Sequence, residues 1–105
     1  MFTFIELSGF SKRRPELMPD DEFREFQEML INEPEAGDVI VGTGGFRKIR
    51  WGRPGKGKSS GVRVIYFNIT PKGRIYLATI YPKNEQDNLT SEQKKLLKKV
   101  SGSLK

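Results

Sequence analysis

The chain has 105 residues, of which 35% are hydrophobic, a formal net charge of +6 at pH 7, no cysteine and no histidine. This length supports one modest core, and the missing residue types exclude disulfides, thiolate metal sites and the histidine base that enzymes most often use. We therefore expect a single domain over residues 1–105 whose chemistry rests on Lys, Arg, Tyr, Asp or Glu.

The sequence carries no sign of export or membrane insertion. No stretch approaches the roughly 20 apolar residues that span a bilayer. The segment Met1 to Leu7 lacks a basic start and a cleavage site. These features predict a soluble, cytoplasmic protein without a membrane partner.

The first elements expected along the chain are a strand and a helical turn. Residues 2–7 alternate apolar and polar side chains, with β-branched and aromatic members, which is typical of a strand. Ser8 and Gly9 end this strand. A short helical turn is expected between Ser11 and Met18, where Pro15 limits its extent.

One amphipathic helix is predicted over Glu22 to Asn32. A carboxylate of the segment 19–21 (Pro-Asp-Asp) is expected as its N-cap, and Pro34 follows as a stop signal. Its apolar side chains fall on one stripe: Phe23, Phe26, Met29 and Leu30. This helix and the preceding turn should cover one face of a sheet.

The rest of the chain predicts three strands and one more helix. Segments 47–51, 61–70 and 73–81, separated by Gly-rich or Pro-Lys-Gly turns, are typical of an antiparallel meander. A weak capping signature at Thr90 begins a short helix, and residues 101–105 are expected to fray. Its apolar positions have helical spacing: Leu96, Leu97 and Val100. The predicted fold is α+β, an antiparallel sheet with two N-terminal helices packed on one face and a short C-terminal helix.

Charge is sharply segregated along the chain. Residues 1–46 carry four basic and ten acidic side chains, residues 47–84 carry ten basic and no acidic ones, and residues 85–105 carry five basic and three acidic ones. Ten cations without a compensating acid repel one another in the folded state, so a polyanionic partner is the simplest reason to keep them. The alternative is that they merely keep a small protein soluble.

Strand alternation predicts which cations act together. Lys48 and Arg50 should share one face of the sheet. The opposite face should carry Arg47, Ile49 and Trp51. Arg63 is expected near a strand end, either beside an open cleft or as a structural ion-pair partner. The triplet 83–85 (Lys-Asn-Glu) either closes the same cleft from its far edge or is an ordinary polar turn.

The segment Gly52 to Ser59 matches the Walker A pattern G-x-x-x-x-G-K-S letter by letter. A true P-loop leads from a strand into a helix whose N-terminus holds the phosphates, but here Ser60 and Gly61 lead into a strand. We therefore reject a nucleotide site and interpret the segment as a hairpin loop with solvated lysines, of which Lys58 is the better placed to reach a phosphate.

Three runs of sequence carry a family resemblance: GDVIVGTGGFRKIRW, GKGKSSGVRVIYF and IYLATIYPKNEQDNLT. They resemble the RelE/ParE toxin superfamily, and most closely the HigB branch of RelE-type toxins with its GTGG-x-RK-x-R signature. The resemblance extends from the first strand to the last helix, and the order of predicted elements is similar to that family's scaffold.

The resemblance implies the toxin of a type II toxin-antitoxin system, an endoribonuclease that enters the ribosomal A site and cuts translated mRNA. It implies no metal and no cofactor, because the mRNA 2′-hydroxyl attacks the adjacent phosphate and leaves a cyclic phosphate and a 5′-hydroxyl. Crowded cations disfavour one another's charged forms, so a lysine among arginines can act as a base. Arginine stays charged and clamps phosphate oxygens.

Carried over to this sequence, the resemblance implies four catalytic residues: Lys48 as base or proton shuttle, Arg50, Arg63 as the transition-state arginine, and Lys83 as phosphate clamp or general acid. Further RNA contacts are expected from Arg47, Lys56, Lys58, Tyr81, Asn84 and Glu85, of which the last two would support Lys83. The chain departs from the family where related sites often add a tyrosine, because residues 86–89 read QDNL. This leaves the leaving-group acid open. The strand tyrosines Tyr66, Tyr76 and Tyr81 are candidates for base stacking or for the core.

The resemblance also implies partners. These are a HigA-like antitoxin with a helix-turn-helix domain, the ribosome with its mRNA, and operator DNA bound through the antitoxin complex. Two alternatives remain: a ParE-like DNA gyrase poison on the same scaffold, and a non-catalytic nucleic-acid-binding module. Retention of the four candidate catalytic residues favours the nuclease over the gyrase poison, and alanine at Arg63 would separate catalysis from binding.

Overall fold

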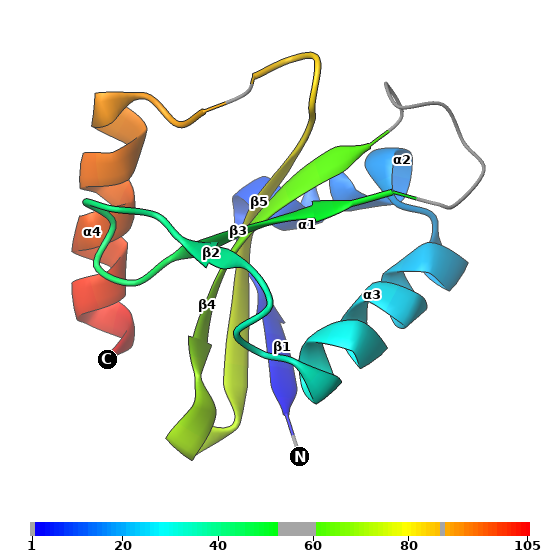
Figure 1. The fold of residues 1–105 in the computed structure, drawn as a ribbon, viewed down its shortest axis with the longest axis horizontal. Helices are drawn as coiled ribbons and strands as arrows, with labels where there is room; N and C mark the ends of the chain where they lie inside the picture. Colours follow the sequence, from blue (N-terminus) through cyan, green and yellow to red (C-terminus); the bar gives the residue numbers. More distant parts are fainter. Residues whose placement is uncertain (1, 53–60, 87) are drawn as a thin grey trace.

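The computed structural model of the protein describes residues 2–52, 61–86 and 88–105. Within these residues, a five-stranded sheet in the order β1-β5-β4-β3-β2 lies between helices on its two sides (Figure 1). The strands are β1 (Thr3–Glu6), β2 (Asp38–Val39), β3 (Arg47–Trp51), β4 (Val62–Ile69) and β5 (Arg74–Pro82). This is the α+β architecture that the sequence predicts.

The three central strands form the expected antiparallel meander. β3 pairs with β4 and β4 pairs with β5, both antiparallel, and the single-turn 3-10 helix η2 (Thr70–Lys72) connects the last two. The edge strand β1 is different, because it lies parallel to β5. Alternating side chains identify a strand but carry no information about its direction, so this parallel pair could not be foreseen.

The N-terminal helices are α1 (Ser8–Ser11), α2 (Arg14–Leu17) and α3 (Asp20–Asn32). The expected turn before the long helix is α2, and Pro15 fits there because it lies in the first turn, where no backbone donor is needed. α1 follows β1 directly, where the sequence predicted only a strand end. The predicted carboxylate N-cap of α3 is wrong. Pro19 occupies that position, and the acids lie in the first turn, where they favour the positive end of the helix dipole.

One hydrophobic core lies between these helices and the sheet. The helices contribute Phe10, Met18, Phe23, Phe26 and Leu30, and the strands contribute Val62, Val64, Tyr66, Ile75, Leu77 and Ile80. The predicted stripe of α3 is confirmed, since Phe23, Phe26 and Leu30 are buried and Met29 packs against them. Trp51, at the end of β3, meets Phe26 edge to face with ring centroids 5.4 Å apart.

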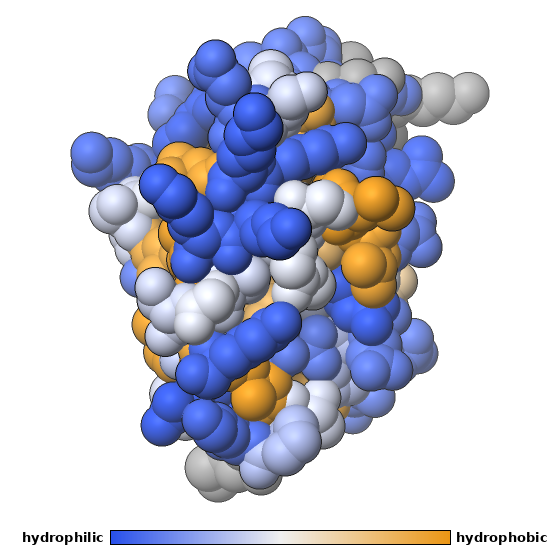
Figure 2. All heavy atoms as spheres, turned by 90° about the vertical axis from the view of Figure 1, so that its left-hand side faces the viewer, coloured by the Kyte–Doolittle hydropathy of each residue, from blue (hydrophilic) through white to orange (hydrophobic). Residues whose placement is uncertain are grey.

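The opposite face of the sheet is covered by α4 (Ser91–Leu104). Its N-terminus has a full capping box, in which Thr90 and Gln93 each bond the other's backbone. A second hydrophobic core lies between α4 and the sheet, formed by Phe46, Ile65, Phe67, Tyr76, Ala78 and Tyr81. Leu97 and Val100 pack against it as predicted, whereas Leu96 is 63% exposed. Figure 2 shows this side of the molecule, where hydrophilic side chains surround separate hydrophobic patches.

The expectation that residues 101–105 fray is wrong. α4 continues to Leu104, and Ser101 is 3% exposed with its hydroxyl bonded to the Lys98 carbonyl at 2.7 Å. The reason lies in the loop before β3, where Gly44 has φ +78° and approaches Ser101 so closely that a Cβ there would lie 2.1 Å from its Oγ. This close approach holds the end of the helix against the loop.

A buried tyrosine fixes the connection between α3 and β2. The hydroxyl of Tyr66 donates to the carbonyl of Pro34 at 2.8 Å and accepts from the backbone N–H of Gly37 at 2.9 Å. The ring is fully buried, so the predicted alternative of a core tyrosine holds here.

None of the helices in the described part of the chain combines the length and apolarity that a membrane span requires.

Candidate active site

The predicted cations meet at one end of the sheet, where β3 ends, β4 begins and β5 ends. Antiparallel register places Arg50 opposite Arg63, and Arg63 opposite Tyr81. A pocket of about 260 Å³ opens at these strand ends. It is lined by Arg50, Trp51, Gly52, Gly61, Arg63 and Lys83. Three of the four predicted catalytic residues therefore share a pocket, and no acid is found among the described residues that line it.

Arg63 is the most buried cation of this pocket, with only 7% of its surface exposed. Its side chain makes no hydrogen bond or ion pair with another residue of the described ranges. Within those ranges the structure gives no support to the ion-pair alternative, and the open-cleft alternative stays a prediction. Its guanidinium lines the pocket and is placed to bind an anion there.

Lys48 lies two positions before Arg50 on β3 and pairs in register with Ile65. Its ammonium donates to the side-chain oxygen of Asn88 at 3.3 Å, across 40 residues of sequence. Lys48 does not line the pocket itself. It is beside the site, held by a neutral amide rather than by a carboxylate.

Lys83 is exposed and belongs to a tight turn after β5. Its backbone N–H donates to the carbonyl of Gly61 at 3.1 Å, and the N–H of Glu85 donates to the carbonyl of Pro82 at 3.1 Å. The backbone of Lys83 is thereby tied to the start of β4, and its side chain lines the pocket. Asn84 is exposed in the same turn.

Glu85 is not directed to the pocket cations. Both of its carboxylate oxygens accept hydrogen bonds from Arg13, at 2.7 and 2.9 Å. This bidentate bond lowers the pKa of Glu85 and raises the pKa of Arg13. The carboxylate of Glu85 is therefore paired with a residue 72 positions away, and its RNA contact stays a prediction.

Two further predicted RNA contacts lie away from the pocket. Arg47 donates to the carbonyl of Gly37 at 2.8 Å and to that of Glu35 at 3.3 Å, so it holds the segment that leads into β2. Tyr81 is 3% exposed in the core beneath α4, and a ring this deeply buried has no face on which a base can stack. These placements give no support to an RNA contact by either residue, and both contacts stay predictions. Tyr76 is likewise a core residue.

The remaining predicted contacts, Lys56 and Lys58, lie outside the described residues. The Walker-like segment also lies there except for Gly52. It joins two antiparallel strands, β3 and β4, and no helix follows it. This arrangement agrees with the rejection of a nucleotide-binding P-loop.

Three residues near the site were missed by reasoning from sequence. Trp51 was expected in the core, and it does pack there, but it also lines the pocket because the strand ends at that position. Asn88 and Arg13 carried no local signal, since each acts on a residue 40 or more positions away.

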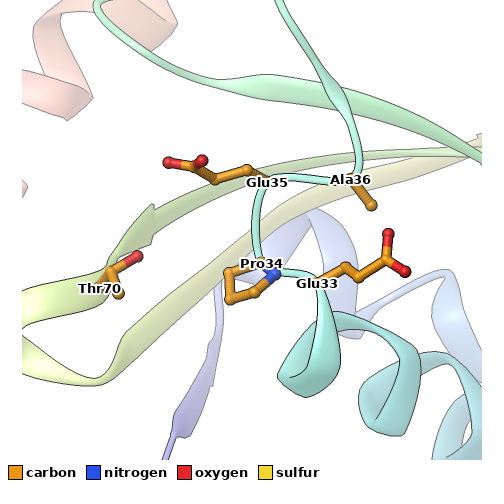
Figure 3. Close-up of a pocket in the computed structure, with 5 residues that line it drawn as sticks. All are labelled: Glu33, Pro34, Glu35, Ala36 and Thr70. Atoms are coloured by element: carbon orange, nitrogen blue, oxygen red, sulfur yellow. The ribbon is translucent and has the colours of Figure 1, made fainter.

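Another pocket is bordered by acidic rather than basic residues. Glu33, Pro34, Glu35, Ala36 and Thr70 line a hollow of about 500 Å³ between the end of α3 and the far end of β4 (Figure 3). None of the four predicted catalytic residues borders it. Among the described residues, no group of three or more His, Cys, Asp or Glu side chains is placed to hold a metal ion.

The pocket, with no acid among the described residues that line it, has the charge that suits a phosphate group. The family model for the RelE toxin of the RelE/RelB toxin-antitoxin system matches residues 18–105. The chain therefore belongs to the RelE toxin family, and as such a toxin it has an antitoxin as its partner.

A solved structure supports the fold. The E. coli toxin RelE, a double arginine-to-alanine mutant in the free state, is similar with a TM-score of 0.59 and 17% sequence identity. The similarity covers 82% of this chain and 87% of that chain.

Proposed function

We propose that this RelE-family protein is a ribosome-dependent mRNA endonuclease of the HigB branch, which cuts translated mRNA in the A site without a metal. The observation that carries the proposal is the pocket in which Arg50, Arg63 and Lys83 meet, with Arg63 buried and without a partner among the described residues. A phosphate diester that becomes a doubly charged phosphorane is a ligand that such a site favours.

The proposed reaction assigns one task to each cation. Lys48, in its neutral form, accepts the proton of the 2′-hydroxyl as the 2′-oxygen attacks the adjacent phosphorus. Arg63 and Arg50 donate hydrogen bonds to the non-bridging oxygens, whose charge increases in the transition state. The bond from phosphorus to the 5′-oxygen breaks, and Lys83 gives that oxygen a proton. The products are a 2′,3′-cyclic phosphate and a 5′-hydroxyl.

The same proposal extends to the partners and the setting of the protein. It includes a HigA-like antitoxin with a helix-turn-helix domain, operator DNA bound through the toxin-antitoxin complex, and the cytoplasm as location. Residues 1–105 would act as one domain. What supports these points is the resemblance of the sequence to the HigB branch, together with membership of the RelE family.

The decisive experiment is induction of wild type and Arg63→Ala in bacteria, followed by mapping of new 5′ ends. We expect cuts inside reading frames that vanish in the mutant and in a message that cannot be translated. Loss of one buried donor to the transition state should lower the cleavage rate by about 10²-fold or more. Growth arrest with intact mRNA would overturn the nuclease and favour a gyrase poison.

A further inference from the structure

The starting point is the ion pair between Arg13 and Glu85. Arg13 lies between α1 and α2, and its side chain bonds Glu85 in the turn after β5. The two guanidinium nitrogens bond the two carboxylate oxygens at 2.7 and 2.9 Å. Planar bidentate pairs of this kind fix the direction of the carboxylate as well as its charge.

Glu85 lies close to the pocket cations along the chain, so the direction of its carboxylate matters for them. It is the first acid after ten cations in residues 47–84, and it follows Lys83 by two positions in a closed turn. Its side chain is exposed, so other side-chain rotamers are open to it. A carboxylate at this place, if released, would be drawn to the cations of the pocket and would compete with phosphate for them.

We propose that Arg13 is a positioning residue that holds the Glu85 carboxylate away from Lys83 and the pocket arginines, so that these cations stay available to RNA phosphate. The inference rests on the proposed function in taking RNA as the ligand. The lowered pKa of Glu85 agrees with it, since the carboxylate stays charged and paired with Arg13 to lower pH than an ordinary glutamate.

The experiment measures binding of a single-stranded RNA oligonucleotide with 2′-O-methyl groups, which cannot be cut. The one tryptophan of the chain, Trp51, lines the pocket and serves as an intrinsic fluorescent reporter. We expect Arg13→Ala to weaken binding by roughly fivefold at low salt, as befits an exposed ion pair. The double variant Arg13→Ala/Glu85→Gln should recover wild-type affinity, and Glu85→Gln alone should bind at least as tightly as wild type.

Arg24→Ala is the matched control, because it removes the same charge from the exposed side of α3 and should leave affinity nearly unchanged. Wild-type affinity in Arg13→Ala would overturn the inference. So would a double variant that binds as weakly as Arg13→Ala, because Arg13 would then act through the structure rather than through Glu85. Should Arg13→Ala fail to fold by circular dichroism, Arg13→Gln with and without Glu85→Gln takes its place.

Cleavage of an unmodified message by wild type is followed separately, on translating ribosomes. If wild type binds the oligonucleotide but cuts no RNA, the nuclease proposal fails, and the affinities of the variants still decide the role of Arg13. If wild type does not bind the oligonucleotide, the inference about Arg13 is overturned, whereas cleavage on translating ribosomes still decides the nuclease proposal.

Discussion

At the scale of single residues, the two most buried polar side chains on β4 differ in their hydrogen bonds. Tyr66 is satisfied by Pro34 and Gly37, whereas Arg63 has no partner among the described residues. Buried polar groups are normally satisfied within the protein, and an exception calls for a functional reason. The contrast supports the proposed role of Arg63 as a phosphate ligand, whereas Tyr66 stabilises the fold.

The role of Tyr66 gives a prediction for stability. Tyr66→Phe removes two hydrogen bonds and leaves the buried N–H of Gly37 without its acceptor, so we expect a loss of about 1–3 kcal/mol in the free energy of unfolding. Urea unfolding near neutral pH measures this loss. Tyr76→Phe is the control, since its hydroxyl makes no hydrogen bond to another described residue, and its loss should be smaller.

Tyr66 also makes the stability of the protein depend on pH. Burial raises the pKa of Tyr66, so the native state keeps the phenol proton at pH values where the unfolded chain loses it. The contribution of Tyr66 to the free energy of unfolding is therefore fully present below the ordinary tyrosine pKa of about 10. It is lost as pH rises through the higher pKa that Tyr66 has in the folded protein. The difference between wild type and Tyr66→Phe should therefore shrink above about pH 10. A difference that stays constant would contradict the assignment.

At the scale of elements, the packing of α4 depends on the loop before β3. Gly44→Ala introduces a Cβ at φ +78° that would lie 2.1 Å from Ser101 Oγ, so the loop or the helix must move. We expect a loss of about 1–3 kcal/mol in stability, measured by thermal unfolding. Gly102→Ala is the control with the opposite sign. It lies within α4 with nothing within 4 Å of the added Cβ, and should stabilise by about 0.5–1 kcal/mol.

The elements also show how far sequence patterns reach. The bounds of β3, β4 and β5 followed from alternation, and α4 from its capping box, because these signals are local. The parallel pairing of β1 and the helical tail of α4 depend on contacts between distant segments, which no local pattern encodes. At the site, strand alternation predicted that Lys48 and Arg50 share a face, and the family resemblance added Arg63. The bond between Arg13 and Glu85 spans 72 positions and no local pattern predicts it.

At the scale of the whole molecule, the acidic and basic parts of the chain belong to different elements of the fold. The acids concentrate in α3 and the segment after it, whereas the cationic pocket lies where β3 ends and β4 begins. The cations at the other end of β4, Lys72 in η2 and Arg74 at the start of β5, are a full strand length from the pocket. Positive charge is therefore present at both ends of the central strands, and at the end with Arg50, Arg63 and Lys83 the described residues that line a pocket include no acid.

This arrangement raises the question of whether RNA is bound by one local site or by the diffuse positive field. The affinity for single-stranded RNA should fall with salt, with a log–log slope of about 0.7 per neutralised phosphate. A local site predicts that Lys83→Ala reduces this slope by about 0.7, because one phosphate contact is lost. Lys72→Ala removes the same charge from the far end of β4 and should leave the slope unchanged. The measurement is the RNA affinity of both variants over a series of salt concentrations. Equal reductions of the slope in the two variants would contradict a local site and show that the positive field of the whole molecule binds RNA.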